Sequence, residues 1–71
     1  MRKRSILIAN RHNTSISLED EFMQELENIA KQQNKNVNQL VTEIDANRTV
    51  SNLSSAIRIY ILEYIKNKIG I

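Results

Sequence analysis

The period of the hydrophobic pattern changes within a few residues between Thr14 and Phe22. From Thr14 to Leu18, polar and apolar residues alternate, which places Ile16 and Leu18 on one face of a short strand. Acidic residues come next, and helical spacing follows at Phe22, Leu26, Ile29 and Ala30. A short strand exposes unpaired backbone groups along its edges, so it needs a neighbouring strand. The sequence therefore predicts a paired strand that leads directly into a helix, which ends near Gln33.

The chain is short, and its composition limits how it can be stabilised. A domain of 71 residues buries only about 60% of its unfolded surface and is marginally stable on its own. Cysteine is absent and His12 is the one histidine, which leaves neither a disulfide framework nor a zinc site with the usual ligand spacing. We therefore expect no metal and no cofactor, and we expect the chain to associate with a second copy of itself.

Positive charge is concentrated at the start of the chain. Residues 1–12 contain no acid and four cations, which are Arg2, Lys3, Arg4 and Arg11. In a dimer, two such arms would form a larger positive patch of the kind that attracts nucleic acid. The alternative interpretation is a solvated start that keeps the chain soluble. We interpret residues 1–12 as a basic N-terminal arm with a possible first strand.

The apolar stretch Ser5–Ala9 allows two interpretations of the region before Thr14. It predicts either a first strand joined by a four-residue loop, Asn10–Asn13, to the second, or one long extended ribbon without a turn. The stretch is shorter than the roughly 7–15 apolar residues of a signal peptide. No later run approaches the roughly 18 apolar residues of a membrane helix. We expect a soluble cytoplasmic protein that has no membrane partner.

Two further helices are predicted after the first. Ser17 and Asp20 have the spacing of a capping box for the first helix, and Asn38 is the expected N-cap of the second, which should end near Ala46 or Asn47. The third helix is expected at residues 52–69, opened by Ser51 or Asn52. Its apolar surface is broad, so we expect it to complete the core between subunits or across both other helices, with a possible protein partner. Its polar residues should face water, namely Ser55, Arg58, Glu63 and Lys66.

One strand followed at once by two helices resembles the ribbon-helix-helix family of bacterial DNA-binding proteins. The resemblance covers Asn13 to about Ala46, and the whole chain is more similar to a small branch of that family. The resemblance to this branch rests on five short stretches: Arg4-Ser5, Thr14-Ser15, Leu18-Glu19, Glu43-Ile44-Asp45 and Asn52-Leu53-Ser54-Ser55-Ala56-Ile57-Arg58. The resemblance implies a mainly α fold with a short β ribbon. Residues 13–71 would form an intertwined dimer whose strands pair antiparallel between chains, and the third helix is an addition to the minimal family.

The resemblance also implies a DNA-binding surface. In the family the ribbon lies in the major groove, and the N-terminus of the second helix holds a phosphate. Base edges would be contacted by the outward strand residues, which are Asn13, Ser15 and Ser17. Phosphates would be contacted by the arm and by the start of the second helix, through Arg2, Lys3, Arg4, Arg11, Asn38 and Gln39. The expected dimer core consists of Ile16, Leu18, Phe22, Leu40, Ile44, Ile57 and Ile61.

The expected function is a dimeric DNA-binding protein, sequence-tolerant or sequence-specific, that regulates transcription in bacteria. The alternative is a dimeric protein-interaction module, such as an antitoxin-like or adaptor protein, that does not bind DNA. Ser17 with His12 and an acid does not indicate a hydrolase, because nothing marks an oxyanion hole or a nucleophile elbow. We expect no enzymatic activity. Tyr60 and Tyr64 are expected in the core, with their hydroxyl groups at its rim.

Overall fold

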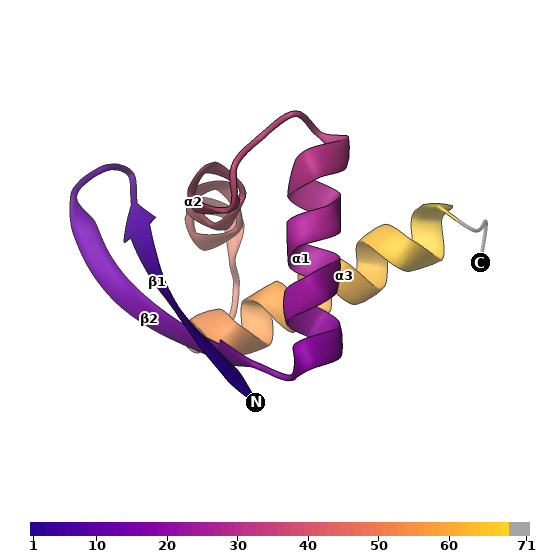
Figure 1. Ribbon diagram of the computed structural model, residues 1–71, viewed down its shortest axis with the longest axis horizontal. Helices are drawn as coiled ribbons and strands as arrows, with labels where there is room; N and C mark the ends of the chain where they lie inside the picture. Colours follow the sequence, from indigo (N-terminus) through magenta and orange to yellow (C-terminus); the bar gives the residue numbers. More distant parts are fainter. Residues whose placement is uncertain (69–71) are drawn as a thin grey trace.

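The computed structural model describes residues 1–68 of the chain. Two strands, β1 (Arg2–Ile8) and β2 (His12–Leu18), are followed by three helices, α1 (Asp20–Gln32), α2 (Val37–Asn47) and α3 (Leu53–Lys68). The strands form an antiparallel hairpin at one side of the molecule, and α3 extends away from it toward the C-terminus (Figure 1). This confirms the predicted three helices after a β segment, and of the two alternatives for that segment it shows the hairpin and not one extended ribbon. Of the predicted third helix, Ile69 lies outside the described residues.

The hairpin has a longer first strand and a shorter loop than the sequence predicted. β1 begins at Arg2, so three of the four cations of the expected arm belong to the sheet, namely Arg2, Lys3 and Arg4. The turn starts one residue earlier than expected, because Ala9 and Asn10 take positive φ angles of 52° and 58°. The N–H of Arg11 closes it by donating to the carbonyl oxygen of Ile8, at 2.9 Å. The partner strand that β2 requires is therefore present in the same chain.

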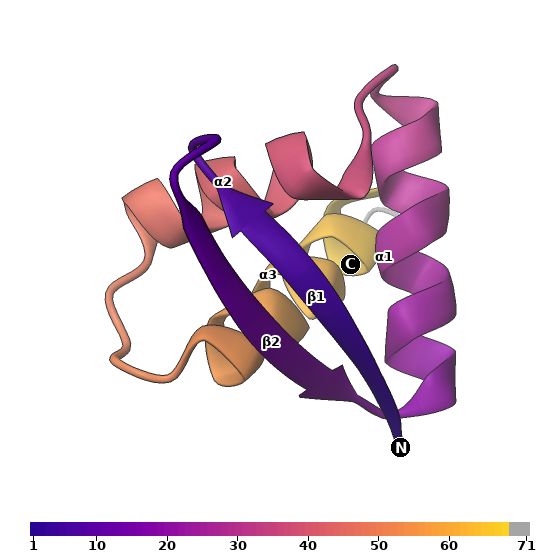
Figure 2. The same cartoon turned by 60° about the vertical axis from the view of Figure 1, so that its left-hand side comes forward.

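A single hydrophobic core joins the hairpin to all three helices. Figure 2 shows the hairpin crossing in front of α2 and α3, with α1 beside it. Its buried residues are Ile6, Ile8, Ile16, Leu18, Met23, Leu26, Ile29, Ala30, Val37, Leu40, Val41, Ile44, Ala56, Ile57 and Ile61. Six of the seven residues expected in a dimer core are buried here within one chain. The seventh, Phe22, is only partly buried, because the neighbouring Met23 occupies the buried position on α1.

The helix ends correct two capping predictions. Glu19 is the N-cap of α1 and makes no side-chain capping bond, so the predicted Ser17–Asp20 box is wrong. Asn36, not Asn38, caps α2, because the chain becomes helical at Val37, two residues earlier than a cap at Asn38 implies. Asn52 caps α3 as predicted, since its Oδ1 accepts from the N–H of Ser55 at 3.0 Å.

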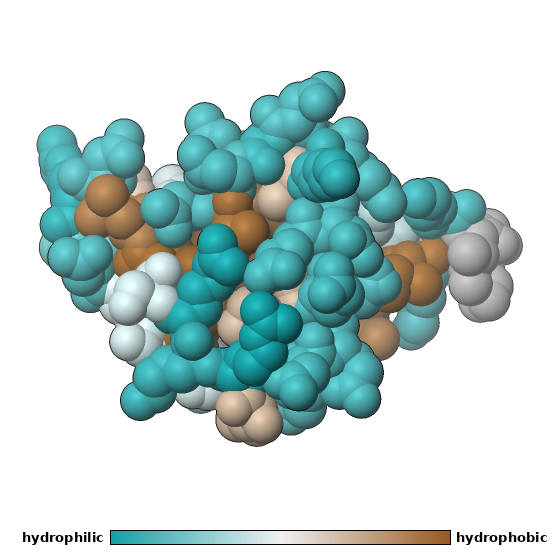
Figure 3. Space-filling view, in the orientation of Figure 1, coloured by the Kyte–Doolittle hydropathy of each residue, from teal (hydrophilic) through white to brown (hydrophobic). Residues whose placement is uncertain are grey.

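The side chains of α3 divide between the core and the surface. Tyr60 and Tyr64 stack at 6.2 Å between ring centroids and pack against the core, and their hydroxyl groups bond to glutamines of the α1 end, as the sequence predicted. Ile59 and Leu62 are about half exposed, at 45% and 48%. Most of the face in Figure 3 is hydrophilic, with hydrophobic surface over α3 on the right and also over the hairpin and α2 on the left. Thus α3 completes the core with one side and leaves apolar surface on the other.

Candidate nucleic-acid interface

The hairpin presents one face to the core and one to solvent. Cross-strand partners share a face, and the register pairs Lys3 with Ser17, Ser5 with Ser15 and Leu7 with Asn13. We call these six residues the outer face of the hairpin: Lys3, Ser5, Leu7, Asn13, Ser15 and Ser17. All are exposed or partly exposed. The three residues predicted to contact bases thus lie together on this face, and three residues of β1 that sequence reasoning did not place there lie beside them.

The inner face of the hairpin holds two of the four predicted phosphate-binding cations. Strand alternation puts Arg2 and Arg4 on the same side as the buried Ile6. Their guanidinium groups both bind the Oε2 atom of Glu27 on α1, at 3.3 Å and 3.0 Å. The structure therefore uses Arg2 and Arg4 to join the hairpin to α1, on the side opposite the predicted base-contacting residues.

The two remaining cations are Lys3 and Arg11. Lys3 lies on the outer face, and Arg11 lies in the exposed turn at the hairpin tip. Neither has an acidic partner within 4 Å among residues 1–68. The strands themselves contain no acidic residue, so nothing on the outer face opposes a negatively charged ligand.

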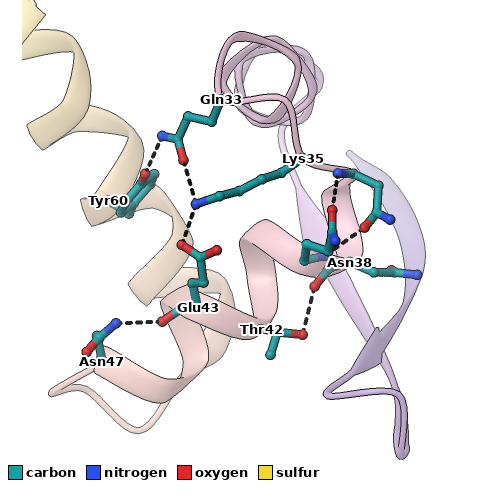
Figure 4. A network of polar contacts seen from close by, with 9 residues as sticks. Gln33, Lys35, Asn38, Thr42, Glu43, Asn47 and Tyr60 are labelled. Carbon is teal, nitrogen blue, oxygen red and sulfur yellow. Dashed lines mark hydrogen bonds and ion pairs between the residues drawn. The ribbon is translucent and has the colours of Figure 1, made fainter.

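One edge of the hairpin is covered and the other is open. On β1, the N–H of Leu7 donates to Oδ1 of Asn38 at 3.2 Å, and the N–H of Ala9 donates to Oγ1 of Thr42 at 3.0 Å. Both acceptors belong to α2, and Thr42 in turn donates to the carbonyl oxygen of Asn38 (Figure 4). Side chains of α2 therefore take the place of a further strand along β1.

The open edge belongs to β2. The N–H of Leu7 points away from β2, and hydrogen-bonding direction alternates along an antiparallel pair, so the outward backbone groups of β2 are those of Asn13, Ser15 and Ser17. The sheet has two strands, and in the described chain no third strand lies beside β2. Only the carbonyl oxygen of Ser17 is approached, by Nη2 of Arg58 at 3.5 Å. The edge is thus free at its centre, Ser15.

The start of α2 is occupied by contacts within the chain. Oδ1 of Asn36 accepts from the N–H of Gln39 at 2.7 Å, and Oε1 of Gln39 accepts from the N–H of Asn36 at 2.9 Å, which together form a capping box. Asn38 already holds the edge of β1. The side chains of both residues predicted to bind phosphate therefore serve the fold, which leaves the N–H groups of Val37 and Asn38 as the orphan donors of this first turn.

A polar network ties the end of α1 to α2 and α3. Nζ of Lys35 lies 2.6 Å from Oε1 of Glu43 and 3.1 Å from Oε1 of Gln33, and the amide of Gln33 donates to the hydroxyl of Tyr60 at 2.9 Å (Figure 4). The charge of Lys35 is thereby matched by a carboxylate. This network rigidifies the support of α2 and adds no free cation to the surface.

An ion pair that the sequence did not predict joins α3 to the end of β2. Nε of Arg58 donates to Oε1 of Glu19 at 2.8 Å, although Arg58 was expected to face water. The hydrogen bond from Arg58 is the main cause that holds the pKa of Glu19 below its usual value, helped by a backbone hydrogen bond. The two residues are 39 positions apart. No local pattern could have indicated the pair.

Among residues 1–68 there is no group of three or more His, Cys, Asp or Glu side chains able to hold a metal ion. No helix in that part of the chain is long and apolar enough to cross a membrane. The candidate site is the outer face of the hairpin together with the open edge of β2, because both are accessible to solvent and the strands contain no acidic residue.

Comparison with known protein families identifies the domain. A family model described as a ribbon-helix-helix domain matches residues 1–65, which includes the hairpin, α1, α2 and most of α3. Searches of curated proteins and of solved structures found no match.

Proposed function

The chain belongs to the ribbon-helix-helix domain family, and from that premise we propose that it is a cytoplasmic bacterial transcription regulator that binds double-stranded DNA as a homodimer. Members of this family generally bind DNA as dimers in transcription regulation and are typically non-enzymatic. The observation that carries the proposal is the outer face of the hairpin, which is polar except for Leu7, free of acids and outside the buried core.

The dimer forms through the open edge of β2. Two copies of β2 pair antiparallel about a two-fold axis at Ser15, so that Ser15 exchanges both backbone hydrogen bonds with its copy. Asn13 then pairs with Ser17 of the second copy. The support for this register is that the outward backbone groups of β2 are those of these three residues, while α2 covers the edge of β1. Because each chain already closes its own core, this dimer is not intertwined through its core residues.

DNA contacts then come from two groups of residues. Asn13, Ser15 and Ser17 lie at the centre of the joined sheet and face base edges in the major groove, where hydroxyl and amide groups can donate or accept. Arg11 at the tip contacts phosphate, and the orphan N–H groups at the start of α2 can hold a further phosphate. Arg2 and Arg4 act indirectly, because Glu27 holds them on the inner face.

The test combines DNA binding with a measurement of size. Binding to random-sequence duplex DNA is measured by fluorescence anisotropy at about 50 mM and about 200 mM salt, because phosphate contacts weaken steeply over that range. Sedimentation measures the mass over micromolar concentrations. We expect a dimer whose affinity falls with salt and whose melting temperature rises with concentration. A monomer at all concentrations, or no binding at the lower salt, overturns the proposal.

A protein-interaction module is the second candidate, favoured by Ile59 and Leu62, which are large apolar residues exposed on α3. The two candidates predict different effects of the pair Ile59→Ser and Leu62→Ser. In a DNA-binding regulator this change leaves duplex affinity unaltered, since neither residue belongs to the outer face of the hairpin. A dimer that binds no duplex at low salt would favour the interaction module.

A further inference from the structure

β1 makes the sheet of the proposed dimer four-stranded, because each chain contributes a two-stranded hairpin. Resting on the proposed function, we infer that the outer face of β1 is a phosphate-contacting strip, in which Lys3 and Ser5 contact the DNA backbone at the rims of the major groove. β2 contributes the base contacts and β1 the rim contacts. The DNA-binding face of each chain thus includes Ser5, which neither composition nor spacing pointed to.

The dimensions of the sheet separate the two roles. Pairing through β2 gives the strand order β1, β2, β2, β1, in which the outer strands lie about 14 Å apart at the usual spacing of about 4.8 Å. The major groove is about 12 Å wide and admits two strands. The two central β2 strands therefore fit into the groove and the β1 strands do not. Each β1 lies over a groove wall, where phosphates and not base edges are within reach.

The charges on β1 agree with this position. The strand begins with three cations, and they are divided between its faces. Glu27 binds Arg2 and Arg4 on the inner face, whereas Lys3 is on the outer face and has no acidic partner among residues 1–68. Ser5 follows Lys3 on that face, directly opposite Ser15, and is exposed. A flexible ammonium and a hydroxyl are groups that commonly contact DNA phosphates.

β1 is also held firmly enough to position these side chains. Its edge is bonded to Asn38 and Thr42 of α2, and its start is bound to α1 through Arg4 and Glu27. The backbone that carries Lys3 and Ser5 therefore belongs to a fixed part of the fold. Only the side chain of Lys3 must be ordered when DNA binds, which keeps the entropic cost of the contact low.

The experiment compares changes on β1 with matched changes on α3. Lys3→Gln and Ser5→Asp are each measured against a panel of duplexes at several salt concentrations. The matched controls are Lys66→Gln and Asn67→Asp, at exposed positions on the far part of α3. Circular dichroism melts verify that every variant is folded.

We expect Lys3→Gln to weaken binding to all duplexes alike. It should flatten the slope of log affinity against log salt by about 1.8, because each lost phosphate contact contributes about 0.9 and the dimer has two. Ser5→Asp should also weaken all duplexes without changing their order, by placing a negative charge beside phosphate. The α3 controls should leave both quantities unchanged.

Two results would overturn the inference while the proposed function stands. The first is a Lys3→Gln variant whose salt slope equals that of Lys66→Gln. The second is a change in the order of preferred duplexes with Ser5→Asp, which would place β1 against bases. If the unmodified protein binds no duplex, the proposed function itself has failed, so the two failures are distinguishable.

Discussion

The two faces of the hairpin have the same backbone and differ in what their side chains do for the fold. On the inner face, Ile6 and Ile16 are almost fully buried, and Arg4 is bound to Glu27. On the outer face, Ser5 and Ser15 lie opposite each other, exposed to solvent and outside the core. Folding therefore constrains the residues of the inner face closely and those of the outer face hardly at all. The residues of the outer face can therefore be suited to binding a ligand without loss of stability, which is why we place the DNA contacts there.

The largest predicted contrast is between Ile16→Asp and Ser15→Asp, which put the same charge on opposite faces at adjacent positions. An unpaired carboxylate at Ile16, 1% exposed, should cost about 3–5 kcal/mol, a large share of the roughly 4–10 kcal/mol expected for a domain of this size. Ser15→Asp should change the stability of a single chain by less than about 1 kcal/mol but abolish duplex binding, because it places like charges opposite each other at the dimer axis and beside phosphate. Thermal and urea unfolding, with anisotropy for binding, measure both. If the two variants unfold alike, the faces are not separated as described.

The same contrast shows what the sequence reveals about this fold. Alternation at Thr14–Leu18 and helical spacing after Phe22 are local signals of burial, so they predicted β2, α1 and the inner-face residues Ile16 and Leu18. Local signals also placed Asn13, Ser15 and Ser17 on the side facing away from the core. Periodicity measures burial, and burial is what most of this fold depends on.

What the sequence did not reveal depends on contacts between distant residues. Arg2 and Arg4 do not by themselves indicate a strand. They lie in β1 because residues 2–8 pair with β2 and because Glu27 binds both guanidinium groups. Asn38 was the predicted cap of α2, but its side chain accepts from the backbone of β1, and Asn36 caps the helix instead. The sequence therefore predicted one basic arm, whereas strand pairing places Arg2 and Arg4 on the inner face of the hairpin and Lys3 on the outer face.

A smaller effect is expected from Arg4→Gln, which sharpens the comparison by using the nearest cation on the other face. Losing its ion pair with Glu27 should cost about 0.5 kcal/mol, since both side chains are partly exposed. The salt slope of DNA binding should stay within error of the unmodified protein, unlike that of Lys3→Gln. Chemical unfolding and salt-dependent anisotropy measure the two quantities. A flattened slope with unchanged stability would show that Arg4 contacts DNA and that its bond to Glu27 is incidental.

The smallest expected effect is a pH dependence at the end of β2, where the open edge meets α3. Arg58 lowers the pKa of Glu19 in the folded protein from its usual 4.5, so the pair contributes stability above about pH 4.5. That contribution is lost as the pH falls through the folded pKa, because the carboxylate must then be protonated. The melting temperature of the unmodified protein should therefore fall more steeply between about pH 5 and pH 3 than that of Glu19→Gln.

Glu21→Gln is the matched control, since Glu21 has no ion-pair partner among residues 1–68. If Glu19→Gln and Glu21→Gln depend equally on acid, the ion pair between Glu19 and Arg58 does not fix α3 to β2 in solution. The carbonyl oxygen of Ser17 would then be as free to pair with a second strand as the backbone of Ser15.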